Sequence, residues 1–177
     1  MAELARDDRV QQLIDESDIR AVLVQYCHGV DRKRFDLVRD CYHPDAIDDH
    51  GVFTGGIDDF IAYITAALRS YERTMHVLSN VRIELDGDHA RSESYAIAHH
   101  RVAARGSKPD RDHVVAFRFL DDFERRGGHW AIANRVLAFE WTRTDPVPPG
   151  WDFGDEFLRG QAWPHDRVFA PRGELIR

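Results

Sequence analysis

Residues 77–141 decide the fold, because four segments there alternate between apolar and polar side chains: VLSNVRIEL (77–85), ARSESYAIAHHRVAA (90–104), VVAFRFLDDF (114–123) and WAIANRVLAFEW (130–141). This alternation, together with many β-branched and aromatic residues, is typical of half-buried strands. Short turn signals separate the segments: Asp86-Gly-Asp, Arg105-Gly-Ser-Lys-Pro and Arg126-Gly-Gly-His. The pattern predicts a meander of long antiparallel strands.

The residues before this stretch have helical spacing. Apolar side chains recur at every third or fourth position over 10–30, 34–42 and 57–71, and segment 46–53 is a further strand candidate. Helices followed by an antiparallel meander predict an α+β fold, with the helices gathered on one face of a curved sheet. We expect a polar lead at residues 1–9, one domain over 10–142 and an irregular, Pro-rich extension over 143–177.

Length and charge narrow the class of protein. The chain has 177 residues, which suits one domain with a substantial core. Its formal net charge of -7 argues against nucleic acid or an anionic membrane as the main partner, because neither is attracted to an acidic surface. Cys27 and Cys41 form no Cys-x-x-Cys motif, and neither a signal peptide nor a membrane-spanning run is visible. We therefore expect a cytoplasmic protein.

Asp31 and His76 are candidates for a catalytic pair. Asp31 ends the first helical segment, and His76 opens the first long strand. A carboxylate that faces an imidazole makes a general base, because it fixes the tautomer of the ring and stabilises the imidazolium formed on proton abstraction. An exposed Asp at a helix end and a structural His remain the alternative interpretation of the same residues.

Strand alternation groups further polar residues on shared strand faces. Asp48 and His50 share one face of segment 46–53. On segment 90–104, His100 shares a face with small residues that suit a cavity wall, although a one-residue bulge would bring in His99 instead. Imidazoles beside carboxylates also raise the alternative of a metal site, but no short ligand motif such as His-x-x-x-His supports it.

Several motifs resemble those of one known family. HGVDRKRFD (28–36), HPDA (43–46), TMH (74–76) and FERRGGHWAIANR (123–135) look like the SnoaL-like branch of the NTF2-like superfamily. This branch includes polyketide cyclases, scytalone dehydratase, hexachlorocyclohexane dehydrochlorinase and bile acid 7α-dehydratase. The resemblance covers roughly residues 10–142 and implies a cone formed by a curved sheet and three helices, with a pocket inside.

The resemblance also implies roles for individual residues. In the lyases of this family, the positions that resemble Asp31 and His76 form a proton-abstracting dyad. The position of Arg135 resembles that of an Arg in the dehydrochlorinase pocket, and Tyr26 resembles the pocket Tyr of the bile acid dehydratase. His50 stands where scytalone dehydratase has a Tyr, which is a departure from that enzyme's pattern.

The resulting expectation is a lyase or isomerase, either dehydratase-like or cyclase-like, acting on a hydrophobic, cyclic small molecule. His76 and Asp31 are the expected catalytic residues, and the enzymes that the chain resembles work without metal or organic cofactor. The expected substrate-binding residues are Tyr26, Asp48, His50, His100 and Arg135. The alternative is a non-catalytic small-molecule-binding or assembly module, including a role like that of the small subunit of a ring-hydroxylating dioxygenase.

The outer face of the sheet predicts self-association. We assign Phe117, Phe119, Ile132 and Phe139 to this face, where they would form a larger apolar patch than monomers usually expose. Together with the resemblance, this patch predicts a homodimer or homotrimer that leaves the pocket open to solvent.

Overall fold

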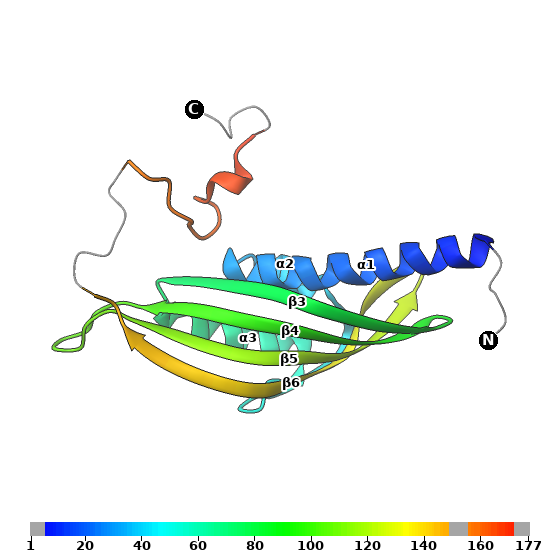
Figure 1. Ribbon diagram of the computed structural model, residues 1–177, viewed down its shortest axis with the longest axis horizontal. Coiled ribbons are helices and arrows are strands. Elements are labelled where there is room, and N and C mark those ends of the chain that lie inside the picture. The colour runs from blue at the N-terminus through cyan, green and yellow to red at the C-terminus, as the bar shows by residue number, and fades with distance from the viewer. Residues whose placement is uncertain (1–5, 149–155, 172–177) are drawn as a thin grey trace.

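The computed structural model describes residues 6–148 and 156–171, and it places six strands in one curved sheet (Figure 1). The strands are β1 (Tyr42–Asp49), β2 (Thr54–Gly56), β3 (Arg73–Asp86), β4 (His89–Val102), β5 (Arg111–Arg126) and β6 (His129–Pro146). Their order is β2-β1-β6-β5-β4-β3. Only the β1–β6 pair is parallel among these strands. The prediction of an α+β fold with a curved, mostly antiparallel sheet is confirmed.

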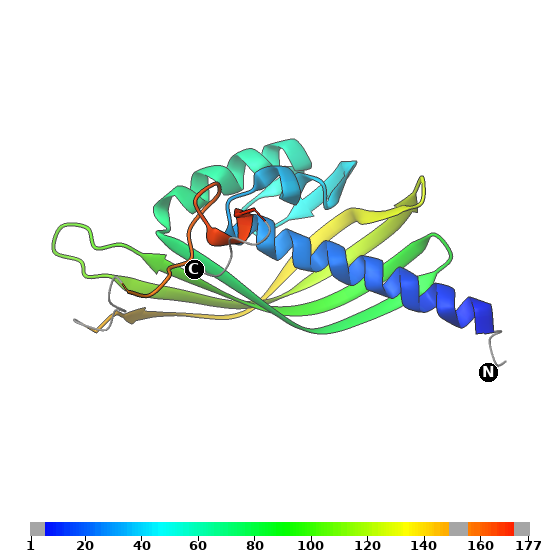
Figure 2. The same cartoon turned by 90° about the horizontal axis from the view of Figure 1, so that it is seen from above.

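The helices cover the concave face of the sheet. They are α1 (Arg6–Asp31), α2 (Phe35–Arg39) and α3 (Ile57–Ala67), which continues into the 3-10 turn η1 (Leu68–Ser70). Figure 2 shows α1 lying obliquely across the sheet, with α3 beside it. Ile19, Leu23 and Cys27 on α1, together with Phe60 and Ile64 on α3, are buried in the core. No helix among the described residues has the length and apolar character that crossing a membrane requires.

Irregularities in pairing accompany the bend of the long strands. The β3–β4 register shifts between Ser79 and Arg82, where Asn80 has a positive φ of 48°. Two further shifts occur between β5 and β6. Such bulges increase local twist and bend a strand, which lets the sheet curl around the helices.

The observed element boundaries differ from the expected ones in the first third of the chain. Helix α1 begins at Arg6, inside the expected polar lead, and α2 ends at Arg39 instead of reaching Tyr42. Tyr42 instead begins β1 and pairs with Ile132. Pro44 is tolerated in β1 because the β1–β6 register is interrupted between Tyr42 and Ile47, where its missing N–H removes no ladder bond.

The assignment of apolar residues to the outer face was wrong. Phe117, Phe119 and Ile132 are buried on the inner face, because this is the face that the helices cover. Phe139 also lies on the inner side, at the cavity described below. A different set of exposed apolar residues forms what we call the outer-face patch: Met75, Val77, Tyr95, Ile97, Leu120, Val136 and Trp141.

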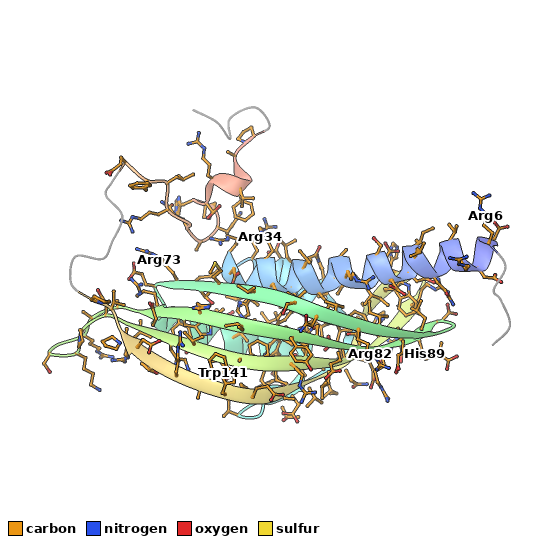
Figure 3. All side chains as sticks on the ribbon, viewed as in Figure 1. Arg6, Arg34, Arg73, Arg82, His89 and Trp141 are labelled. Atoms are coloured by element: carbon orange, nitrogen blue, oxygen red, sulfur yellow. The ribbon has the colours of Figure 1, made fainter. Side chains whose placement is uncertain are left out.

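Residues 143–146 of the expected C-terminal extension belong to β6, whereas residues 156–171 pack against the end of α1. The Trp163 backbone N–H donates to the Arg32 carbonyl oxygen at 2.8 Å. The Arg32 guanidinium donates to Asp166 at 3.0 Å. Figure 3 labels Arg34 near the C-terminal end of α1. Its guanidinium lies 5.5 Å from the centre of the Trp163 ring, a cation–π contact. Residues 156–171 are therefore an irregular arm, with one 3-10 turn (η2, Arg167–Phe169), that contacts the residues immediately after Asp31.

Candidate active site

A cavity of about 350 Å³ opens on the concave side of the sheet. Its walls come from α1, from the turn after β1, from α3 and η1, and from strands β3 to β6. The lining is mostly apolar and aromatic, with a few imidazoles and hydroxyls, as is usual for a small-molecule pocket. The lining residues are Tyr26, Val30, His50, Val52, Tyr63, Ile64, Ala67, Leu68, Tyr71, His76, Ala98, His100, His113, Val115, Phe117, Phe119, Leu137 and Phe139.

Asp31 and His76 are in direct contact at the wall of this cavity. The Asp31 Oδ1 and the His76 Nδ1 lie 2.7 Å apart, and Asp31 Oδ2 accepts the His76 backbone N–H at 2.8 Å. That N–H is available because β3 is an edge strand of the sheet. The two side chains are only 10% and 9% exposed. The expected contact is present, and it leaves the Nε2 of His76 as the second ring nitrogen, on a side chain that lines the cavity.

A second carboxylate–imidazole pair stands where β1 ends. Asp48 has no exposed surface. Its Oδ2 accepts the Tyr42 hydroxyl at 2.7 Å, and its Oδ1 is hydrogen-bonded to the Nδ1 of His50. The Nε2 of His50 lies 3.4 Å from the Tyr26 hydroxyl. Tyr26 and His50 thus line the cavity, as expected, whereas Asp48 reaches it only through His50.

His100, rather than His99, faces the cavity. Its Nδ1 lies 2.8 Å from the Thr74 hydroxyl, and its ring stacks on Tyr71 with a centroid separation of 4.3 Å. Burial lowers the pKa of His100 to about 4, and the neighbouring His76 and His113 contribute to the decrease. His100 is therefore uncharged at neutral pH and suits a hydrogen bond to a polar, uncharged group.

Burial raises the pKa of Tyr26, whereas it lowers that of His100. Removal of its hydroxyl from water raises the pKa of Tyr26 above its ordinary value, and the nearby Arg135 offsets only part of the increase. The hydroxyl thus stays protonated at neutral pH and can donate a hydrogen bond.

Arg135, an expected substrate-binding residue, does not line the cavity. Its side chain is fully buried, and its Nε and Nη2 atoms donate to the two carboxylate oxygens of Asp121 at 2.7 and 2.8 Å. The guanidinium lies 4.3 Å from the centre of the Tyr26 ring and 3.9 Å from that of Phe119, and both rings line the cavity. Arg135 thus sits one layer beneath the cavity wall, where Asp121, directly opposite on β5, neutralises it.

Comparison with known proteins identifies the family. A family model described as SnoaL-like domain matches residues 11–136. The chain belongs to the SnoaL-like domain family. A relative in Mycobacterium tuberculosis, named only as an uncharacterized protein, is 30% identical over 133 residues, which cover 72% of this chain and 86% of the relative.

Solved structures place this SnoaL-like chain in the NTF2-like fold, as the sequence predicted. A type 2 hexachlorocyclohexane dehydrochlorinase has a TM-score of 0.70 at 18% identity, with 80% of this chain and 99% of the other covered. A protein from Kribbella flavida has a TM-score of 0.69 at 20% identity, with coverages of 75% and 95%. A scytalone dehydratase-like protein from Novosphingobium aromaticivorans has a TM-score of 0.66 at 19% identity, with coverages of 80% and 97%.

The SnoaL-like site also contains residues that the sequence did not single out. His113 lines the cavity, and its Nδ1 lies 3.0 Å from the Thr144 hydroxyl. Its position two residues before Val115 and four before Phe117 was the available signal, because alternate residues of a strand share a face. Among the described residues, no group of three or more His, Cys, Asp or Glu side chains is arranged to hold a metal ion.

Proposed function

We propose that this SnoaL-like protein is a cofactor-independent lyase or isomerase in which His76 removes a proton from carbon. The observation that carries this proposal is the contact between Asp31 and His76 at a mostly apolar cavity. Asp31 holds the ring through Nδ1, so that Nε2 is the basic nitrogen available to a substrate. Its carboxylate also stabilises the imidazolium that forms.

The cavity favours a hydrophobic, cyclic substrate with few polar groups. Phe117, Phe119 and Leu137 offer apolar surface, whereas Tyr26 and His100 offer hydrogen bonds without a fixed charge. An imidazole can remove a proton from the carbon next to a carbonyl group when the negative charge that develops on the carbonyl oxygen is stabilised by a hydrogen bond. Dehydration of a hydroxylated ring ketone and cyclisation by aldol chemistry both begin with this step.

The test is a panel of β-hydroxycycloalkanones with one to three fused rings. Loss of water from these compounds gives conjugated enones, which are detected by their ultraviolet absorbance. Wild-type protein should convert at least one of them, and His76→Gln should lower turnover by about 10²–10⁴-fold, the usual contribution of general base catalysis. His89→Gln is the matched control, since His89 is exposed at the start of β4. Equal turnover by wild type and His76→Gln would contradict the proposal.

The outer-face patch supports a second proposal, that copies of this chain assemble through the sheet. Val77, Ile97 and Trp141 lie on one cross-strand row, and all three are exposed. Exposed apolar surface of this kind is a feature of interaction sites. The cavity lies on the opposite face of the sheet, so that assembly through the patch would leave its mouth open. This assembly would also suit a protein that only binds a small molecule.

A further inference from the structure

The Asp48–His50 pair lies along the same cavity as the Asp31–His76 pair. The His76 ring contacts Phe117 at a centroid separation of 6.4 Å, and Phe117 contacts Phe119 at 4.9 Å. Phe119 in turn packs edge-to-face against Tyr26 at 5.4 Å. Two phenyl rings therefore form an apolar wall between His76 and the Tyr26–His50 group. A substrate that lies along this wall would reach both ends.

His50 is the imidazole bonded to the buried carboxylate of Asp48. A buried carboxylate requires a compensating partner. Arg135, a buried cation nearby, is engaged by both oxygens of Asp121 and reaches Asp48 only through the Tyr42 hydroxyl, 3.4 Å from its Nη1. His50 is directly hydrogen-bonded to Asp48. A second proton on its ring would place an N–H at Nε2, directed at the Tyr26 oxygen.

We propose that Tyr26 and His50 together donate the proton that a leaving hydroxyl needs, and that Asp48 is the positioning residue that holds His50. This inference rests on the proposed function, because it supplies the acid for the base His76. His76 Nε2 takes the proton from carbon, and the electrons of that bond form the C=C bond as the C–O bond breaks. The departing oxygen takes the Tyr26 hydroxyl proton and leaves as water, while Tyr26 regains a proton from His50 Nε2. His76 finally releases its proton to solvent, and His50 takes one up.

Proton transfer from His50 to Tyr26, which we call the relay, is needed because Tyr26 alone is a poor acid. Its burial raises its pKa, so a tyrosinate beside Phe119 would be costly, and transfer from His50 avoids that state. The separation of 3.4 Å between His50 Nε2 and Tyr26 Oη is long for such a transfer, but catalytic hydrogen bonds commonly shorten when substrate binds. His100 cannot take this role at neutral pH, since burial lowers its pKa to about 4.

The position of Arg135 narrows the substrate class further. A halide leaves as an anion and is stabilised by a cation, whereas the guanidinium of Arg135 is buried and paired with Asp121. Hydroxide is a poor leaving group and requires a proton. With Arg135 occupied by Asp121 and a proton donor at Tyr26 and His50, the site fits loss of water from a β-hydroxy ring ketone.

The test compares two leaving groups on the same ring. A β-hydroxycycloalkanone needs a proton donor, whereas its β-acetoxy counterpart expels acetate without one, and both give the same enone. The variants are His50→Gln and Asp48→Asn, with Tyr26→Phe to remove the hydroxyl while keeping the ring. His89→Gln again serves as the control. Thermal unfolding followed by circular dichroism verifies that each variant is folded.

We expect His50→Gln and Tyr26→Phe to lower kcat/KM for the hydroxy compound by about 10²–10⁴-fold. Their losses on the acetoxy compound should be at least one order of magnitude smaller. Asp48→Asn should follow the same pattern, which a merely structural role would not produce. His76→Gln should lose both reactions, since both need the base.

Three results would overturn the inference. Equal losses on both compounds would make His50 a structural residue, and unchanged turnover of the hydroxy compound in His50→Gln would remove it from the reaction. If the wild type converts the acetoxy compound but not the hydroxy compound, the role of His76 as base stands, but the role of Tyr26 and His50 as proton donors is contradicted. If wild type converts neither compound, the proposed function itself fails, and the relay fails with it.

Discussion

Two carboxylates on the inner face of the sheet, Asp121 and Asp31, differ in whether their nitrogen-bearing partner keeps a nitrogen atom for a ligand. The Arg135–Asp121 pair is wholly buried, and two parallel hydrogen bonds join its two groups. The Asp31–His76 pair stands at the cavity wall, where the second ring nitrogen of His76 is left for another partner. In a buried pair that is fully matched, removal of one partner leaves an uncompensated charge and destabilises the fold. A pair that leaves a basic nitrogen at a cavity can act on a ligand.

Their surroundings explain the difference. Tyr26 and Phe119 cover the Arg135 guanidinium, so that the floor of the cavity is aromatic rather than charged. His76 lies farther along the sheet, where small Ala98 on β4 is its directly paired neighbour. A small side chain there leaves space beside the imidazole. The same inner face thus carries a structural ion pair at one depth and a candidate base at another.

The largest expected effect is that of Asp31→Asn on turnover. The amide keeps the size of the side chain and can still accept the His76 backbone N–H. It cannot stabilise an imidazolium, so turnover of a β-hydroxycycloalkanone should fall by about 10²–10⁴-fold. Thermal unfolding should change little, because Asp31 is at the cavity wall. A large loss of stability with normal activity in the folded fraction would make this pair structural, like Arg135–Asp121.

Arg135→Met should lower stability much more than turnover. It leaves the buried Asp121 without its cation, and breaking a buried pair in this way costs about 3–5 kcal/mol of the free energy of unfolding. The double variant Arg135→Met with Asp121→Leu should recover much of that loss, since no uncompensated charge remains. Urea unfolding measures the free energy of unfolding of the single and the double variant. Loss of turnover with unchanged stability would instead show that Arg135 acts on the ligand.

These two pairs also show how far the sequence could predict the site. The Asp31–His76 contact and the inward placement of Asp48 and His50 followed from the family resemblance, and the small residues on its strand face selected His100. Alternation gives the face of a strand but not the depth, so the burial of Arg135 beneath the cavity was missed. The partner that reveals it, Asp121, lies on another strand, and its pairing depends on the β5–β6 register shifts.

The fold was predictable because long alternating strands and helical spacing are strong local signals. The residues of the outer face could not be predicted, because either set of alternating residues on β5 is apolar enough to be buried. Phe117 and Phe119 alternate with Ala116, Arg118 and Leu120, and only the helices on the concave side decide which set faces the core. The end of α2 was also missed, since the pairing of Tyr42 with Ile132 is a long-range contact.

A smaller effect is expected at the outer-face patch. Wild-type protein should sediment as a multiple of its 20.5 kDa chain mass at micromolar concentration. Trp141→Glu places a charge in the patch and should shift the population toward the monomer, without loss of the cavity on the other face. Val10→Glu is the control, since Val10 is an exposed apolar residue of α1. A single species of monomer mass for wild type would contradict assembly.

The smallest effect is expected at the C-terminal arm. Partial burial tends to raise the pKa of Asp166, but the backbone N–H groups of Gln161 and Val168, together with Arg32, outweigh it and lower the pKa. A lowered pKa in the folded state means that the contribution of Asp166 is present at neutral pH and is lost as the pH falls through the acid range. The arm should therefore become more sensitive to proteolysis on acidification. Asp166→Asn should reduce this pH dependence, and an unchanged pH dependence in that variant would remove Asp166 from the docking contact.

The most direct test of the claim that His76 is a base measures proton removal from carbon in a reaction that needs no proton donor. Parent cycloalkanones without a leaving group are incubated in D2O with the protein, and mass spectrometry follows deuterium incorporation at the carbon next to the carbonyl. If His76 is a base held by Asp31, wild type accelerates this exchange, whereas His76→Gln and Asp31→Asn return it close to the rate without protein. Exchange that proceeds in His76→Gln at the wild-type rate would contradict the account.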